Sequence, residues 1–389
     1  MATTLHHNKR QRHPKTPVTS RFLKFTAALW LGASAMSLQS ALASEPVGPR
    51  HLIIYNWSDY VAPGTLSQFE AETGIQTLYR TYDSNQGLEA SLLAGAPADL
   101  IFPSAQPLGA ALVRGGLLQP LNRGLLGNYA NLDLPSLAEL AEVDPENRHL
   151  IPYLWGTTGL GYNIGKIEEI FDGEAPIDSW TLLFDPQNSA RLSGCGIAVL
   201  DDETEGLSAA LIYLGLPLDT GQPEHLRAVV SLWSQVSPHV RYFNSSRYLD
   251  DLAQGRICLA LGYSGDILQA RDRAERASSG VEIEYAIPNE GALRWIDTVA
   301  IPASATNVEE AHQFIDFLLR PEVIAEISNH VEYANANPRS EALLRPQLRE
   351  DPAIYPSAER MATLSASIAP RAVDKRRRSR AWRRIKSSR

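Results

Sequence analysis

The fold is indicated by residues 51–102, which read HLIIYNWSDYVAPGTLSQFEAETGIQTLYRTYDSNQGLEASLLAGAPADLIF. Apolar runs of strand length alternate along this stretch with segments of helical spacing, at 51–55, 65–73, 75–81, 87–93 and 98–102. Gly74 and Gly95 follow the two helical segments, as a glycine that ends a helix commonly does. This order of strands and helices predicts a parallel sheet that is covered by helices.

The same alternation starts again in the second half of the chain. Strands are expected at 194–200, 257–261, 281–287 and 294–301, and helices at 207–214, 224–235, 266–277 and 307–319, the last of them capped by Asn307. The pattern predicts an α/β protein of two lobes, joined by short crossings near 152–156 and 288–292. The expected parts are a signal peptide at 1–43, a first lobe at 44–152 that resumes at 289–345, a second lobe at 153–288, and a C-terminal helical segment at 346–389.

The first 43 residues have the composition of a secretory signal. Basic residues up to Lys24 precede an apolar and small-residue stretch at 25–38, and Ala41-Leu42-Ala43 has the small-x-small form of a cleavage site. An N-terminal membrane anchor is the alternative, but four Ser and Gln residues within 34–40 dilute the apolar run. We therefore expect a cleaved, exported, soluble chain that begins near Ser44.

The mature chain is acidic. Removal of the six basic residues of the signal peptide changes the formal net charge from −8 to −14. Such a charge disfavours nucleic acid and anionic membranes as partners and favours a cationic solute. The basic segment at 375–386 could in isolation bind an anionic surface, but in an exported protein a solvated helix face, with Trp382 and Ile385 packed on the body, is favoured.

The chain has two cysteines, Cys195 and Cys258. Export to an oxidising compartment makes a disulfide between them plausible, and two buried thiols are the alternative. A metal site is not expected, because no Cys or His lies at ligand spacing beside them.

Polar segments follow several of the predicted strands, where open α/β sheets bind their ligands. They are Asn56–Tyr60, Asp83–Asn85, Pro103–Ala105, Asp201–Glu205, Gly262–Asp266 and Trp295–Asp297. The segments share carboxylates beside aromatic rings and hydroxyl groups, although a lone aromatic after a strand is often core and an acid at a helix start is often a cap. Together they suit an organic ammonium ion, which carboxylates bind by charge-assisted hydrogen bonds and aromatic faces attract.

Sequence motifs of enzymes are missing. The chain has no P-loop, no HExxH and no G-x-S-x-G, and the glycine-rich run at 156–161 lacks the spacing of a phosphate loop. We expect no catalysis, no cofactor and no metal. A hydrolase that uses paired carboxylates across a cleft is the remaining enzymatic alternative.

At these segments the sequence resembles the periplasmic putrescine- and spermidine-binding proteins of bacterial ABC importers. The similar stretches include YNWSDYVAPGTLSQFEAETGI (55–75), IPYLWGTTGLGYN (151–163), RYFNSSRYLDDLAQGRICLALGYSGD (241–266), FLLRPEVIAEISNHVEYANAN (317–337) and RAWRRIKSSR (380–389). The resemblance covers nearly all of the mature chain. It implies a type II periplasmic-binding fold, with hinge-linked lobes around a ligand cleft, and a Cys195–Cys258 disulfide.

The resemblance also implies the residues of the binding site. They are Trp57, Ser58, Asp59 and Tyr60 of the first lobe, the Ser104 hydroxyl, Glu205 from the second lobe, the ammonium-binding Asp266 and Asp297, and the aromatic walls Tyr263, Trp295 and Tyr333. Tyr263 stands where several family members have Trp, and Trp295 stands where putrescine-selective members tend to have Phe. The choice between putrescine and spermidine stays open, as does the choice between Glu205 and its acidic neighbours.

The expected function is capture of a polyamine in the periplasm and its delivery, by a monomer, to the membrane permease of an ABC transporter. The alternatives are a protein of the same fold for another cationic solute, a polyamine sensor and, last, a secreted hydrolase.

Overall fold

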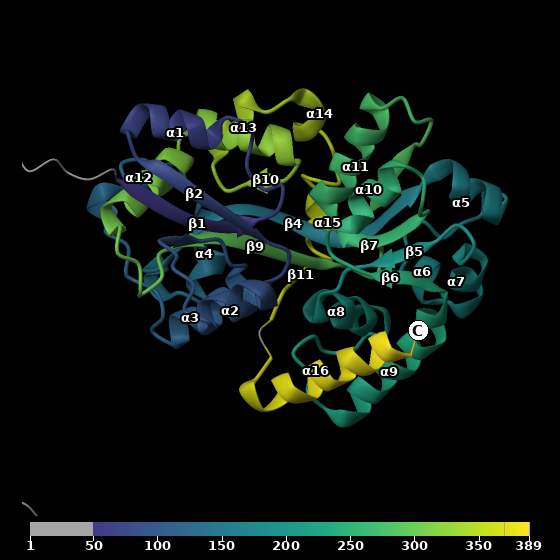
Figure 1. Ribbon diagram of the computed structural model, residues 1–389. Coiled ribbons are helices and arrows are strands. Elements are labelled where there is room, and N and C mark those ends of the chain that lie inside the picture. Colours follow the sequence, from purple (N-terminus) through teal and green to yellow (C-terminus); the bar gives the residue numbers. More distant parts are fainter. Residues whose placement is uncertain (1–49, 369, 389) are drawn as a thin grey trace, which may run out of the picture. The chain divides into compact units, whose positions relative to one another are not determined.

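The computed structural model describes residues 50–368 and 370–388 (Figure 1). The signal peptide that the sequence predicts at 1–43 lies outside these residues. No helix within the described part has both the length and the hydropathy that a membrane crossing requires.

The strand and helix order predicted for residues 51–102 is confirmed. The elements are β1 (His51–Trp57), α1 (Thr65–Thr73), β2 (Gln76–Tyr82), α2 (Asn85–Leu93) and β3 (Leu100–Ile101). β1 pairs in parallel with both β2 and β3, so its carboxyl end lies beside theirs. Gly74 ends α1 in the left-handed conformation, with φ 71°, which a residue with a Cβ rarely adopts.

Short elements connect β3 to the central strands. They are η1 (Ala105–Gly109), α3 (Ala110–Arg114), η2 (Arg123–Leu125), η3 (Tyr129–Asn131), α4 (Leu134–Ala141) and η4 (Pro145–Asn147). Figure 1 shows α2, α3 and α4 on one face of this part of the sheet and α1 on the other.

Two long antiparallel strands, β4 (Leu150–Asn163) and β9 (Leu293–Ala300), run through the middle of the sheet. The strand order is β2-β1-β3-β9-β4-β7-β5-β6, with β8 and β10 paired to β4 and β11 paired to β9. The sheet is therefore mixed: the outer groups are parallel, as predicted, and the central strands are antiparallel. The crossing expected near 152–156 lies within β4, whose register shifts between Pro152 and Trp155.

The second half of the chain forms its own α/β group. Its elements are α5 (Ile164–Phe171), α6 (Thr181–Phe184), α7 (Pro186–Leu192), β5 (Ile197–Val199), α8 (Glu203–Tyr213), α9 (Pro223–Val236), η5 (Ser237–His239), β6 (Val240–Phe243), α10 (Arg247–Ala253), β7 (Leu259–Tyr263), α11 (Ser264–Arg276) and β8 (Ile283–Ala286). α8 begins at Glu203 rather than at 207, because the Asp202 side chain accepts hydrogen bonds from the amides of Thr204 and Glu205 and so caps the helix.

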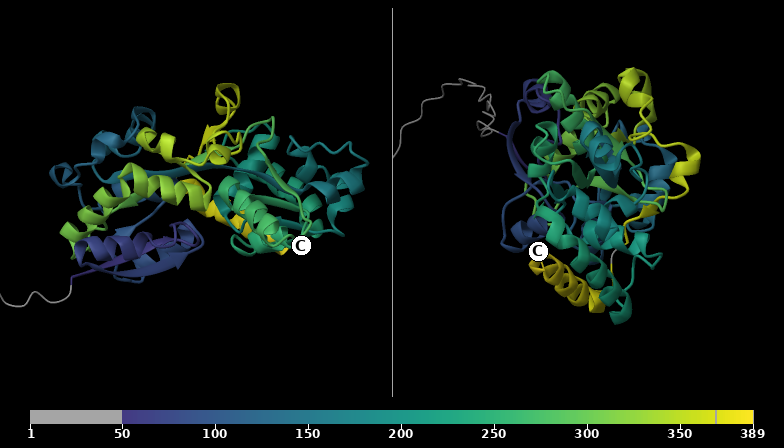
Figure 2. Two further views of the ribbon diagram at one scale, coloured as in Figure 1. Left: turned by 90° about the horizontal axis from the view of Figure 1, so that it is seen from above. Right: turned by 90° about the vertical axis from the view of Figure 1, so that its right-hand side faces the viewer.

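The last part of the chain first packs on the elements of the first half and then ends in a helix that packs on the second half. Its elements are α12 (Val308–Leu318), α13 (Pro321–Val331), β10 (Ala334–Asn335), η6 (Pro338–Leu343), α14 (Pro346–Arg349), α15 (Ala358–Met361), β11 (Ser365–Ala366) and α16 (Ala372–Ser387). Asn307 precedes α12, but the prediction that its side chain caps this helix is wrong: the Asn307 amide donates instead to Asp99, 3.0 Å away. Figures 1 and 2 show α16 lying against α9.

The buried apolar side chains form two large clusters and smaller ones. One large cluster contains Phe69, Phe102, Phe314 and their neighbours, and the other contains Trp180, Trp233 and Ile385 among others. Cys195 and Cys258 lie at the second cluster and form the expected disulfide, with 5.6 Å between their Cα atoms. Closing a loop of 63 residues contributes about 4 kcal/mol in the chain-entropy model.

Candidate ligand-binding site

One cavity collects all eleven of the residues that the sequence predicted for the site. Its other lining residues are Tyr82, Asp83, Asn85, Gln106, Pro107, Asp202, Thr204, Ser245, Ser246 and Leu249. Most of these additional residues belong to, or directly follow, the polar segments after β2, β3 and β5. Ser245, Ser246 and Leu249 were missed because β6, which they follow, is too short to give a clear alternating pattern.

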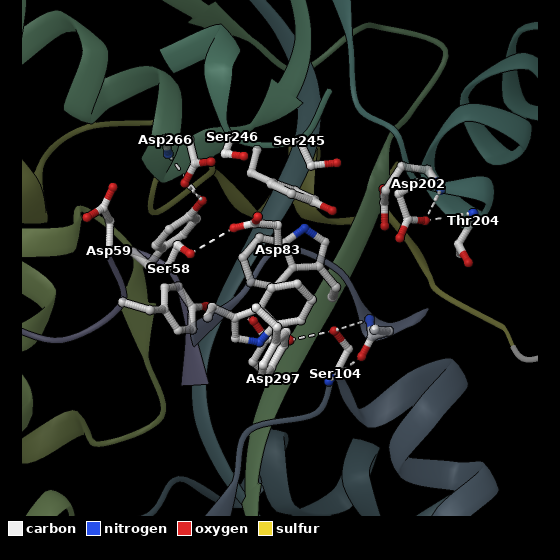
Figure 3. A pocket seen from close by; sticks show the side chains of 18 of the residues that line it. Ser58, Asp59, Asp83, Ser104, Asp202, Thr204, Ser245, Ser246, Asp266 and Asp297 are labelled. Atoms are coloured by element: carbon white, nitrogen blue, oxygen red, sulfur yellow. Dashed lines mark hydrogen bonds between the residues drawn. The ribbon is translucent and has the colours of Figure 1, made fainter. Parts of the chain in front are cut away.

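Asp297 lies on β9 at the bottom of the cavity in Figure 3 and is 4% exposed. Its carboxylate accepts a hydrogen bond of 2.6 Å from the Ser104 hydroxyl and one of 2.8 Å from the Tyr60 hydroxyl. Burial raises the pKa of Asp297 to about 7, although both hydrogen bonds act in the opposite direction. The Asn85 amide in turn donates to the Ser104 hydroxyl over 3.0 Å, so the first turn of α2 helps to orient this group.

Asp266 occupies the first turn of α11. It accepts hydrogen bonds from the hydroxyls of Tyr333, at 2.7 Å, and of Tyr248, at 2.6 Å. Burial raises its pKa as well, against the effect of the two tyrosines. Tyr248 was not predicted, because it lies behind Asp266 and not among the residues that line the cavity.

Aromatic rings lie between these two carboxylates in Figure 3. The Tyr60 hydroxyl donates to Asp297 and the Tyr333 hydroxyl donates to Asp266. The rings of these two tyrosines meet edge to face, with their centroids 5.4 Å apart. The Trp295 ring contacts Tyr333, at 5.3 Å, and Tyr263, at 5.6 Å. Gly156 on β4 makes room for Trp295, since a Cβ there would collide with the indole. The walls can therefore cover methylene groups and attract a cation.

The start of α8 brings two further acids to the cavity, Asp202 and Glu205. The Asp202 carboxylate caps the helix, with 2.7 Å to the amide of Thr204 and 3.1 Å to that of Glu205. Glu205 is only 7% exposed, and its Oε2 has no hydrogen-bond partner among the described residues. Burial, together with the nearby Asp202, raises the pKa of Glu205 to about 8.

Ser58 and Asp59 lie nearer to solvent. The Ser58 hydroxyl donates to Asp83 over 2.7 Å, a bond that Figure 3 marks. The Asp59 side chain is 67% exposed and lies 3.4 Å from a guanidinium nitrogen of Arg273, with which it forms an ion pair. This contact joins the segment after β1 to α11, and it places Asp59 at the rim of the cavity.

The chemistry of the cavity is that of a cation site. Six of its lining residues are Asp or Glu and none is Lys or Arg. Two of these carboxylates, Asp266 and Asp297, are held by tyrosine hydroxyls, and a third, Glu205, has an Oε2 without a hydrogen-bond partner among the residues that the structure describes. Among the described residues, no group of three His, Cys, Asp or Glu side chains is arranged to hold a metal ion. An organic cation with an apolar middle satisfies both the acids and the rings.

A mixed sheet with a cleft at its strand ends and a long antiparallel central pair defines a type II periplasmic solute-binding protein. Residues 65–356 match the model of the bacterial extracellular solute-binding protein family, and the chain belongs to that family. The α/β two-lobed fold class that the sequence predicted is thereby confirmed.

Several relatives are similar along nearly their whole length. The putrescine-binding periplasmic protein SpuD of Pseudomonas aeruginosa is 45% identical over 94% of this chain and 99% of its own length. The putrescine-binding periplasmic protein PotF of Escherichia coli is 42% identical over 94% of this chain and 98% of its own. A spermidine/putrescine-binding periplasmic protein of Salmonella typhimurium is 33% identical over 84% and 88%. Each is named as a binding protein, which agrees with the expectation that this chain is not an enzyme.

Comparison with solved structures supports the same fold class. A putative spermidine/putrescine ABC transporter protein from Listeria monocytogenes is 30% identical and superposes with a TM-score of 0.78, over 87% of this chain and all of that one.

Proposed function

We propose that the chain is a periplasmic polyamine-binding protein that captures putrescine or a closely related polyamine and delivers it to the permease of an ABC importer. One observation carries the proposal: the two buried carboxylates of Asp297 and Asp266 are held by Tyr60 and Tyr333, whose rings are in contact with each other. A diamine can place one ammonium at each carboxylate and its methylene groups against these rings.

We propose the following individual roles, which the geometry of the cavity supports. Asp266 and Asp297 bind the ammonium groups, Tyr60, Tyr263, Trp295 and Tyr333 cover the chain between them, and Ser104 positions Asp297. Trp57 and Ser58 complete the wall. Glu205 shares one of these two ammonium groups from the side of α8, and Asp59 contributes negative charge at the rim. The names of the two relatives above 40% identity support putrescine as the ligand.

The proposal includes the organisation of the mature protein. The two large core clusters support lobes at 44–152 with 289–345 and at 153–288, with the segment at 346–389 packed on them. The relatives' names support export to the periplasm, after removal of residues 1–43, and a partnership with an ABC transporter. We propose a monomer, since a shuttle needs no second copy, and no nucleic-acid partner for a chain this acidic.

The experiment is a calorimetric titration of the mature chain, refolded to remove any bound ligand, with putrescine and then with spermidine. We expect one-to-one binding at about micromolar affinity or better, near −8 kcal/mol. Butylamine is the matched control ligand, because it has the same four carbons with a single ammonium, and it should bind at least about a hundredfold more weakly than putrescine. Equal affinities for butylamine and putrescine, or no heat with any of the three, would refute the proposal.

A further inference from the structure

The C-terminal helix α16 lies outside the cavity but contacts the elements that supply one of its walls. The helix runs along α8 and α9 (Figure 1). Its basic side chains are mostly exposed, while Trp382 and Ile385 are buried in the core of the second half of the chain. Arg378 is only 2% exposed and donates to the backbone carbonyls of Leu218, at 2.8 Å, and Thr220, at 3.2 Å. These bonds anchor the middle of the helix.

The wall is formed by the first turn of α8 and by the segment that follows β6. Trp382 contacts a residue beside each of them, Gly206 and Phe243. Its indole lies against the backbone of Gly206, so closely that a Cβ at that position would collide with the ring. Gly206 directly follows Glu205 in the first turn of α8. On its other side the indole meets the Phe243 ring edge to face, at 5.5 Å, and Phe243 ends β6 just before Ser245 and Ser246 of the cavity.

Polar contacts hold the same turn of α8 from the same side. The Lys386 ammonium lies 2.6 Å from Asp201, the residue that precedes the capping Asp202. Burial raises the pKa of Glu203, and the Ser379 hydroxyl and the Arg378 guanidinium of α16 lower it in part, so this carboxylate faces α16. Residues 201, 203 and 206 are thus bound to α16, and residues 202, 204 and 205, between them, face the cavity.

We propose that α16 is a positioning element of the ligand site, in which Trp382 and Lys386 fix the first turn of α8 and through it the direction of the Glu205 carboxylate. This inference rests on the proposed function, because it assigns the effect to a ligand ammonium at Glu205. Trp382 and Lys386 touch no ligand themselves and are positioning residues.

The test is a double-mutant cycle with Trp382→Phe and Glu205→Gln, read by titration with putrescine. We expect Trp382→Phe to weaken binding about tenfold in the wild-type background and less than about threefold in the Glu205→Gln background, because coupled residues do not act additively. The matched control is Trp180→Phe, which shortens a buried tryptophan of the same core cluster away from α8's first turn. It should lower thermal stability but change affinity by less than about twofold.

A second variant, at Lys386, tests the same inference without changing a buried apolar residue. Lys386→Ala should weaken putrescine binding by about threefold, whereas Lys386→Arg, which keeps the positive charge, should bind putrescine as the wild type does. Lys166→Ala, which breaks the exposed pair between Lys166 and Glu169, is its control and should have no effect. Equal losses for Trp382→Phe in both backgrounds, or equal losses for Trp180→Phe, would overturn the inference and leave α16 a purely structural helix.

If the proposed function is wrong, the titrations give a result that differs from failure of the α16 inference. In that case the wild-type chain does not bind putrescine, and hydrogen exchange of the amides at 203–206 in the ligand-free protein becomes the measurement. Faster exchange in Trp382→Phe than in wild type and Trp180→Phe supports the positioning role without any ligand, and unchanged exchange refutes it.

Discussion

Replacing Asp297 with Asn is expected to stabilise the ligand-free protein while it abolishes ligand binding. Burial raises the pKa of this carboxyl to about 7 in the folded protein, whereas an Asp of the unfolded chain titrates near 3.9. The folded state therefore binds the proton more tightly than the unfolded chain does. The ionised carboxylate costs no stability below about pH 4, costs more as the pH rises from 4 to 7, and costs its full amount above that.

The magnitude follows from the same values. A difference of about three pH units corresponds to an upper limit of about 4 kcal/mol at pH 8. Asn keeps an oxygen for the Ser104 hydroxyl, but it presents an amide to Tyr60 in place of the second oxygen. Allowing for that poorer contact, we expect Asp297→Asn to gain about 1–2 kcal/mol at pH 8, or about 1–3 °C in Tm.

The assay is thermal unfolding of ligand-free wild type and Asp297→Asn at pH 4.5 and pH 8, together with a putrescine titration at pH 8. We expect a higher Tm for the variant at pH 8 only, and an affinity loss of at least about a hundredfold, because a bound ammonium would lack its carboxylate. Asp99→Asn is the control: Asp99 is also buried, but it accepts hydrogen bonds from the amides of Ile53, Thr306 and Asn307, so its replacement should lower Tm and leave affinity unchanged. A lower Tm for Asp297→Asn at pH 8 would refute the reasoning.

Three further results are expected. Because burial and Asp202 raise the pKa of Glu205 to about 8, putrescine should displace a proton and bind more tightly as the pH rises from 6 to 9; the heat of binding at pH 7 should differ between phosphate and Tris buffers, and a buffer-independent heat would contradict this. Tyr248→Phe, which removes one hydrogen bond from Asp266, should weaken putrescine binding about tenfold with little change in m-value; unchanged affinity would show that Tyr333 alone orients the carboxylate. Replacing both disulfide cysteines, Cys195 and Cys258, with Ser should cost up to about 4 kcal/mol in denaturant unfolding but leave affinity within about twofold, and a large loss of affinity would tie the disulfide to the site.

The outer parts of the sheet could be predicted because their strands and helices alternate with clear periodicity and end at glycines. The central strand β4 was predicted only as a short crossing that leads into a strand, since the run at 156–161 contains three glycines and does not show the apolar pattern of a long strand. The structure supplies the reason for all three: a Cβ at Gly156 would collide with Trp295, one at Gly159 with the backbone of Ala286, and one at Gly161 with Ile267. Glycine here makes room for packing against a strand, and that requirement is set by residues more than 100 positions away.

Most of the lining residues were predictable from the rule that ligands bind at strand ends, whereas Tyr333 was implied only by the family resemblance, and the orienting roles of Tyr248 and Asn85 were not predicted. Tyr248 holds Asp266 from α10, and Asn85 holds Ser104 from α2. Neither residue has a sequence signal for that role, because the first contact depends on how α10 and α11 pack and the second on how α2 lies beside the segment after β3. Trp382 shows the same limit, since its contact with Gly206 joins positions 176 residues apart.

The choice among the acids at 202–205 shows how a helix boundary can determine a ligand contact. The sequence places three acids in this stretch and leaves open which of them reaches the ligand. With α8 beginning at Glu203, Asp202 becomes the N-cap, and its Oδ1 accepts hydrogen bonds from the amides of both Thr204 and Glu205. Glu203 faces Ser379 and Arg378 of α16 and does not line the cavity. Glu205 lines the cavity, does not cap the helix, and has an oxygen, Oε2, without a hydrogen-bond partner among the described residues, and this favours it as the acid that α8 offers to an ammonium group. Had the helix begun four residues later, Asp202 would not cap it, and the same three acids would offer no such distinction.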